Sequence, residues 1–179
     1  MSLVPICGSP ETKLIIIRGN SASGKTTAAW EIRRRFGRGL AIVSQDVLRR
    51  DILRVRDEPV NPAIGLIDLT ARYALDHGYH VIVEGIMSNA SYGEMLTTLV
   101  HDHGGSSAAF YYDLSFDETV MRHAGKPESA EYGPELMAGW YRERDLIPAL
   151  HEHIFDADIS LNDAVRAVMT AVDLPVREG

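Results

Sequence analysis

Residues 19–26 read GNSASGKT and match the pattern G-x-x-x-x-G-K-[ST] at every fixed position. A short apolar run, 14–18, comes directly before this segment, and a stretch with helical spacing, 25–36, comes directly after it. Small residues allow successive backbone N–H groups to turn inward around a phosphate, which also lies at the positive end of the following helix. The segment therefore predicts a phosphate-binding loop, and a glycine-rich turn that only reverses the chain is the weaker alternative.

Two side chains of this loop have predicted roles in binding a nucleoside triphosphate and its metal. Lys25 would reach the β- and γ-phosphates, and the Thr26 hydroxyl would ligate Mg²⁺. The sequence contains no N-K-x-D string of the kind that reads guanine, which argues against a GTPase switch. The residues predicted to surround the nucleotide are Gly19, Asn20, Ser21, Ala22, Ser23, Gly24, Lys25, Thr26 and Thr27.

Asp46 follows a second apolar run, 40–44, so its carboxylate should project into the crevice that holds the γ-phosphate. An alcohol is a weak nucleophile at pH 7, and a carboxylate within hydrogen-bond reach can accept its proton during phosphoryl transfer. Asp46 is therefore the predicted catalytic base. Capping of the helix that begins at Val47 is the alternative, and the two roles can coexist. Arg49, one turn further along, could hold an anionic or polar group of the acceptor.

Glu84 follows a third apolar run, 80–83. An acidic residue at this place commonly orders Mg²⁺ through water or binds a substrate hydroxyl, so Glu84 is a candidate for metal or substrate binding. A buried glutamate paired with an arginine is the alternative.

A segment with glycine and proline but little apolar content, within about 122–145, predicts a mobile lid. Phosphoryl transfer needs positive charge over the phosphate oxygens and exclusion of water, and basic residues bracket or follow this segment. The basic residues are Arg122, Lys126, Arg142 and Arg144. Because Glu143 and Asp145 are their sequence neighbours, Arg142 or Arg144 could instead form ordinary surface salt bridges.

The elements that would position these residues alternate between strands and helices. Each predicted strand is a continuous apolar run, which is typical of a parallel sheet covered on both faces. The chain therefore predicts an α/β fold with ligands at the carboxyl ends of the strands. Strands are expected at 14–18, 40–44, 80–83, 108–114 and 157–160. Helices are expected at 25–36, from 47 to about 56, from 62 to a stop at 78, from 88 or 89 to about 104, from 115 to about 125, at 134–147 and at 162–172.

The composition favours one domain that does not bind polyanions through charge. With 179 residues, of which 45% are apolar, the chain can bury one core, and residues 1–179 are predicted to form a single domain. The net charge of −7 argues against charge-driven binding to nucleic acid or to an anionic membrane. The lone Cys7 excludes an internal disulfide, and neither a membrane segment nor a secretory signal is recognisable. A cytoplasmic monomer or homodimer is expected.

Four segments together resemble the nucleoside-monophosphate-kinase-like P-loop kinases: the loop at 19–26, Asp46, VIVEG at 81–85 and the region of Arg122. Within this group the chain is most similar to small-molecule kinases such as chloramphenicol phosphotransferase and to the zeta-toxin sugar-nucleotide kinases. The resemblance implies a three-layer P-loop NTPase fold whose five-stranded parallel sheet has the order 2-3-1-4-5. It also implies ATP and Mg²⁺ bound by Lys25 and Thr26, Asp46 as base, and lid charge from Arg122 with Arg142 or Arg144.

The leading hypothesis is an ATP-dependent kinase that phosphorylates a hydroxyl of a small molecule such as a metabolite, a sugar nucleotide or an antibiotic. A polynucleotide 5′-hydroxyl kinase is the first alternative, because Asp46 and Arg49 resemble the base-and-arginine pair of those enzymes. A non-catalytic ATP-sensing protein is the second. A nucleoside monophosphate acceptor is disfavoured, since Glu84 and Gly85 stand where adenylate kinases have D-G-F-P-R.

Overall fold

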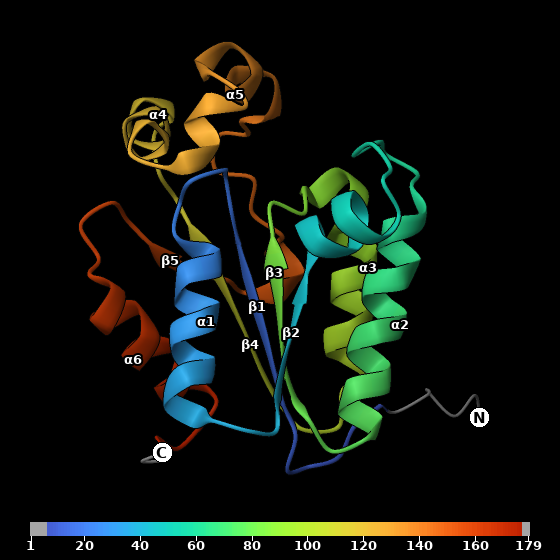
Figure 1. Ribbon diagram of the computed structural model, residues 1–179. Helices are drawn as coiled ribbons and strands as arrows, with labels where there is room; N and C mark the ends of the chain where they lie inside the picture. The colour runs from blue at the N-terminus through green and yellow to red at the C-terminus, as the bar shows by residue number, and fades with distance from the viewer. Residues whose placement is uncertain (1–6, 177–179) are drawn as a thin grey trace.

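The computed structural model describes residues 7–176, and within these residues five parallel strands form one sheet (Figure 1). The strands are β1 (Lys13–Gly19), β2 (Leu40–Ser44), β3 (His80–Gly85), β4 (Ser106–Tyr112) and β5 (His153–Phe155). Their order is β2-β3-β1-β4-β5, and every neighbouring pair is parallel. The predicted α/β class and strand order are therefore confirmed.

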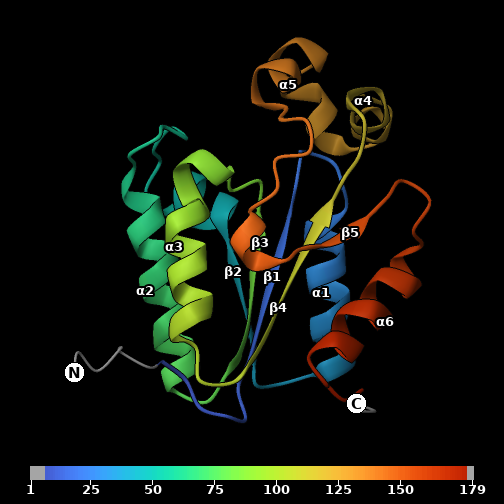
Figure 2. The ribbon, with the colours of Figure 1, turned by 180° about the vertical axis from the view of Figure 1, so that it is seen from behind.

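Helices cover both faces of this sheet and produce three layers (Figures 1 and 2). One face carries α1 (Lys25–Phe36) and α6 (Leu161–Ala171), and the other carries α2 (Pro62–Asp76) and α3 (Asn89–Asp102). Successive side chains of a strand point to opposite faces. Accordingly, Ile15 and Ile17 of β1 pack in the cluster with α1 and α6, whereas Leu14 and Ile16 pack in the cluster with α2 and α3. Burial on both faces explains why β1 is apolar at all four positions.

The helix predicted from 47 to about 56 is much shorter than expected. It is a π-helix, η1 (Val47–Ile52), and Leu48 is its buried residue. Ile52, the last residue of this π-helix, is 59% exposed. The chain then turns through Arg54, whose φ of +54° is incompatible with a continuing right-handed helix. With so little apolar burial to stabilise it, the longer helix does not form.

Three other predicted boundaries were wrong. The helix that was expected at 134–147 is α5 (Pro134–Trp140), because residues beyond Trp140 bond to the end of the sheet instead of continuing the helix. The fourth strand lies at 106–112 and not at 108–114. The fifth strand was expected at 157–160 but is formed by 153–155, since Phe155 packs against the rings of Phe110 and Tyr112 at centroid distances of 5.3 and 5.2 Å.

Most of the segment between β4 and β5 stands above the carboxyl end of the sheet (Figures 1 and 2), and this part contains α4 (Phe116–Ala124), the 3-10 helix η2 (Pro127–Ala130) and α5. The 3-10 helix η3 (Pro148–Leu150) lies lower and packs beside α3, with Leu150 in the core cluster. Ser115 caps α4, with the Glu118 amide donating to Ser115 Oγ at 3.2 Å. Among residues 7–176, no helix is both long and apolar enough to cross a membrane.

Candidate active site

The phosphate loop joins the carboxyl end of β1 to the first residue of α1. Gly19 has a φ of +146°, and a Cβ at this position would lie 2.8 Å from the Tyr112 carbonyl oxygen, so only glycine fits. Gly24, the residue before α1, has a φ of +104° and has no side chain that could cap the helix. The first amides of α1 therefore remain available to an anion, as the sequence pattern predicts.

Lys25 is buried at the centre of this loop, with 7% of its surface exposed. Its Nζ donates hydrogen bonds to the Asn20 carbonyl oxygen at 2.7 Å and to Ser23 Oγ at 3.2 Å. Burial lowers the pKa of Lys25 to about 8, although the nearby carboxylates of Glu84 and Asp46 act in the opposite direction. A buried amine bonded only to neutral loop atoms fits the binding of phosphate oxygens, which would supply the missing negative charge.

Thr26 and Glu84 meet between the phosphate loop and β3. The Thr26 hydroxyl donates to Glu84 Oε2 at 3.1 Å, and the Glu84 residue is 3% exposed. The hydrogen bond of Glu84 thus goes to the loop threonine, so the alternative of a simple pair with arginine does not describe this carboxylate. Hydroxyl and carboxylate oxygens are the ligands that Mg²⁺ prefers. These two residues would hold a Mg²⁺ ion, which would supply positive charge against the phosphate oxygens.

Asp46 lies just beyond the end of β2, whose last residue, Ser44, pairs with Glu84 of β3. Its side chain is 61% exposed and makes no hydrogen bond to the amides of η1. The capping alternative is therefore not what the structure contains. Asp46 lies near enough to Lys25 for its negative charge to raise the pKa of that lysine, against the larger effect of burial.

Arg49 pairs with Asp46, with Nη2 at 3.1 Å from Asp46 Oδ1. Its Nη1 donates to the Val55 carbonyl oxygen at 3.2 Å. Within the described part of the chain, Arg49 Nε is buried and has no hydrogen-bond partner. The predicted pair of carboxylate and arginine is thus assembled at the crevice.

The structure places the lid arginines in three different situations. Arg122 reaches the phosphate loop, where Nη1 lies 3.4 Å from the Ser23 carbonyl oxygen, and Nη2 donates to the Ala157 carbonyl oxygen at 2.8 Å. Arg142 is exposed, and its guanidinium bonds to carbonyl oxygens of its own segment. Arg144 forms an ion pair with Asp113 at 2.7 Å. Of the three side chains, Arg122 is therefore the one that already contacts the loop.

Sequence reasoning missed the role of Arg18, the residue directly before the loop. The Arg18 side chain is fully buried, and its guanidinium lies 2.7 Å from Glu152 and 3.0 Å from Asp145. Its Nε donates to the Met87 carbonyl oxygen at 2.9 Å. An arginine inside an apolar strand was a signal for a buried ion pair. Its partners, however, are more than 120 residues further along the chain.

A second hydrogen-bond network that the sequence did not predict holds the chain close to Asp46. The Tyr92 hydroxyl donates to Asp57 Oδ1 at 2.7 Å, and Gln45 Nε2 donates to Asp57 Oδ2 at 3.3 Å. Burial and the neighbouring carboxylate raise the pKa of Tyr92 to about 12, so the phenol remains a donor at neutral pH. These contacts hold the irregular chain between η1 and α2 against the end of the sheet.

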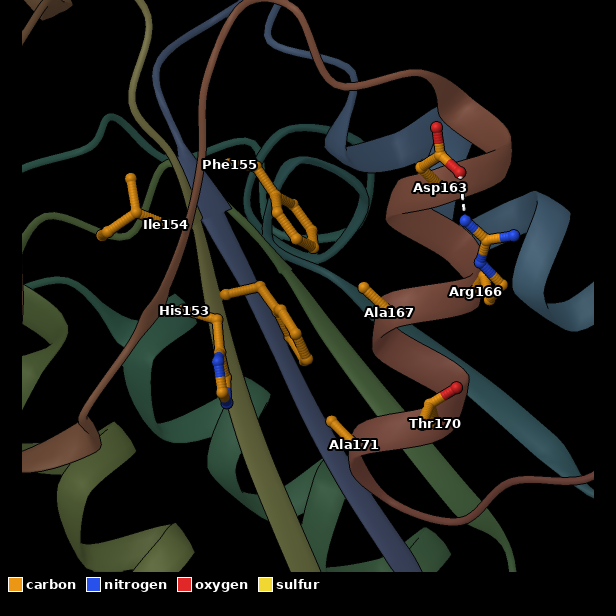
Figure 3. A pocket seen from close by; sticks show the side chains of 9 residues that line it. His153, Ile154, Phe155, Asp163, Arg166, Ala167, Thr170 and Ala171 are labelled. Carbon is orange, nitrogen blue, oxygen red and sulfur yellow. Dashed lines mark hydrogen bonds and ion pairs between the residues drawn. The ribbon is translucent and has the colours of Figure 1, made fainter.

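A separate hollow lies between β5 and α6 (Figure 3). Aromatic rings of Phe110, His153 and Phe155 form one side, and α6 forms the other with small residues and the ion pair of Asp163 and Arg166. Neither the phosphate loop nor Asp46, Glu84 or the lid contributes to its lining. This hollow is therefore distinct from the candidate active site.

A glycine-rich loop after β1, an acidic residue at the end of β3 and the observed sheet order define the P-loop nucleotide-binding class. The AAA domain family matches residues 14–139, which is more than half of the sequence, and the chain belongs to this family. A search of the curated proteins gives no match.

Several solved structures, two of them kinases, share the fold at low sequence identity. The APS kinase of Mycobacterium tuberculosis, in complex with AMPPNP and APS, is 18% identical, with a TM-score of 0.69 and coverage of 92% of this chain and 99% of that one. A gluconokinase from Sinorhizobium meliloti is 18% identical, with a TM-score of 0.60 and coverage of 93% of each chain. The tunicamycin resistance protein of Deinococcus radiodurans is 16% identical, with a TM-score of 0.63 and coverage of 94% and 99%. At these identities the similarity establishes the P-loop kinase fold.

Proposed function

We propose that this chain transfers the γ-phosphate of ATP to a hydroxyl group of a small molecule. The observation that carries the proposal is the Asp46 carboxylate, which is exposed just beyond the end of β2 and lies near enough to Lys25 for its charge to act on the pKa of that lysine. A phosphate loop alone would serve a switch equally well. An available carboxylate beside it supplies the group that a hydroxyl acceptor requires.

The residues of the site divide the reaction between them. Asp46 accepts the proton of the acceptor hydroxyl while the hydroxyl oxygen forms its bond to the γ-phosphorus. The bond from the γ-phosphorus to the bridging oxygen breaks, and ADP leaves. Lys25 and the loop amides hold the phosphate oxygens, Thr26 and Glu84 hold Mg²⁺, and Arg122 adds positive charge from the lid side.

Arg49 has two functions in this proposal. Its ion pair with Asp46, at 3.1 Å, holds that carboxylate in place for the acceptor hydroxyl. It also offers positive charge to an anionic or polar group of the acceptor. Small-molecule acceptors are consistent with the structural neighbours, which include an APS kinase and a gluconokinase.

An acceptor screen that follows ADP release tests the proposal. Hydroxylated metabolites, sugar nucleotides and antibiotics are supplied with Mg·ATP, and a hit is expected to raise ADP release well above the rate with water. Asp46→Asn should lower kcat for that acceptor by about 100-fold or more, with ATP affinity changed little. Asp51→Asn, on the same π-helix, is the matched control and should retain the activity. If neither variant loses activity, Asp46 has no part in the mechanism.

A polynucleotide 5′-hydroxyl kinase remains the second candidate, because the Asp46–Arg49 pair at 3.1 Å could also orient a nucleic-acid end. The net charge of −7 weighs against it. Incubation with radiolabelled ATP and 5′-hydroxyl oligonucleotides of RNA and DNA at low salt separates the candidates. Labelled ends together with an empty small-molecule screen would favour the nucleic-acid kinase.

A further inference from the structure

The chain that returns from the lid passes directly over the phosphate loop. We call residues 141–152, between α5 and β5, the strap. At its start, the Asn20 side chain makes two hydrogen bonds to one strap residue. Oδ1 accepts from the Arg142 amide at 2.8 Å, and Nδ2 donates to the Arg142 carbonyl oxygen at 2.7 Å. Because one partner is a donor and the other an acceptor, only this orientation of the Asn20 amide satisfies both.

Further along, the strap is held by buried charged groups. Asp145 accepts from Arg18 and from the Asn89 amide, and its own amide donates to the Tyr111 hydroxyl at 3.0 Å. Glu152 accepts from Arg18 with one oxygen and from the Ile147 amide with the other, both at 2.7 Å. Between these anchors and Asn20, Arg144 adopts a left-handed φ of +43°. Such a conformation is costly for a residue other than glycine, and it persists only where the surroundings hold it.

From these contacts we infer that Asn20 is a positioning residue that fixes Arg142 relative to the phosphate loop. The Asn20 residue is 4% exposed, so its amide is not available to solvent or to a second partner on the surface. Its backbone is part of the phosphate loop, whereas its side chain is hydrogen-bonded to the strap. The inference rests on the proposed kinase function and adds to it that the exposed Arg142 guanidinium joins Arg122 at the transferring phosphate oxygens.

Asn20 can affect catalysis because it contacts residues on both sides of the proposed site. The Asn20 carbonyl oxygen accepts from Lys25 Nζ, so one residue contacts both the phosphate-binding lysine and the lid arginine's backbone. Misplacing a charged group by about 1 Å can lower a rate by about 100-fold. Loss of the Asn20 amide would let the strap shift while the loop amides still bind the nucleotide.

A double-mutant cycle with an independent exchange measurement tests the inference. Asn20→Ala should lower kcat by about tenfold in the wild-type background but less than about twofold when Arg142 is already alanine, because Asn20 acts through Arg142. The ATP KM should change by less than about threefold, since backbone amides make that contact. Asn89→Ala, which removes the hydrogen bond from Asn89 Nδ2 to the Leu146 carbonyl oxygen, is the matched control and should leave kcat within about twofold.

Hydrogen exchange on the nucleotide-free protein tests the link without any catalysis. In Asn20→Ala the Arg142 amide should exchange about ten times faster or more, whereas Asn89→Ala should leave it protected. Unchanged exchange at Arg142, or an equal loss of kcat in both backgrounds, would overturn the inference. If no acceptor is ever phosphorylated but the Arg142 amide is released in Asn20→Ala alone, the proposed function fails while the link between loop and strap stands.

Discussion

At alkaline pH, nucleotide binding should be accompanied by the uptake of a proton, because Lys25 is largely neutral at that pH in the nucleotide-free protein. Burial lowers the pKa of Lys25 to about 8, and its contacts there are the neutral Asn20 carbonyl and Ser23 hydroxyl. Phosphate oxygens favour the charged amine and raise this pKa in the complex. Between the two pKa values the complex holds one more proton than the free protein. The affinity for nucleotide must therefore fall as pH rises above 8.

The magnitude follows from the fraction of free protein in which Lys25 is neutral. With a free pKa of about 8, roughly a quarter of the lysine is neutral at pH 7.5 and about nine tenths at pH 9. Binding should take up the same fraction of a proton, and the dissociation constant should rise about eightfold between these values. The terminal phosphate of ADP titrates near pH 6 and contributes little here. Tyr92 and Tyr112, whose pKa values burial raises to about 12, do not titrate in this range.

Isothermal titration calorimetry with Mg·ADP measures both quantities, when the binding enthalpy is compared between buffers of different ionisation enthalpy. Lys25→Arg is the control, since a guanidinium stays charged throughout and should abolish both the proton uptake and the pH dependence. Zero proton uptake by the wild-type protein at pH 9 would mean that the buried amine is already charged, and it would refute the reasoning.

Three further predictions concern single side chains. Glu84→Gln keeps a hydrogen bond to Thr26 but removes the charge, and it should raise the Mg²⁺ concentration needed for half-maximal ATP turnover by about tenfold, as measured by Mg²⁺ titration. Arg18→Met leaves the buried carboxylate of Glu152 and the partly exposed carboxylate of Asp145 without their cation, and it should lower the free energy of unfolding by about 3–5 kcal/mol in urea, whereas Arg34→Met, in an exposed pair, should cost less than about 1 kcal/mol. Arg122→Gln should lower kcat by about 100-fold with a smaller change in ATP affinity, because its guanidinium lies over the loop and not within it; a change in affinity alone would contradict this.

The phosphate loop and its two flanking elements were predictable because the information for them is local. Gly19 and Gly24 need positive φ, and the helix that follows is amphipathic over its whole length. Strand order is a long-range property and came from the resemblance to P-loop kinases. Asp46 and Glu84 could be placed together because parallel strands end at the same edge of the sheet. Their roles stay predictions.

Short elements without a strong periodic pattern were not predictable. The segments 153–155 and 157–160 are both short enough to pass for a strand, and the aromatic contacts of Phe155 with β4 decide between them. The same limit applies to the chain after Ile52, where a network around Asp57 replaces the expected helical turns. In both cases the deciding partner lies far away in the sequence.

Burial separates the arginines that support the site from those that could act in it. The Arg18 side chain is fully buried and is paired with two carboxylates. Moving it to a substrate would leave both carboxylates without their positive partner, at a cost of about 3–5 kcal/mol. Arg122 pairs with the partly exposed Glu118 and bonds to carbonyl oxygens, and the exposed Arg142 bonds to carbonyl oxygens alone. Contacts of this kind near the surface cost about 1 kcal/mol or less to exchange. In the proposed reaction, an arginine that moves onto the transferring phosphate would therefore come from the lid. The role of Arg18 and its carboxylate partners is to keep the loop and the strap in place.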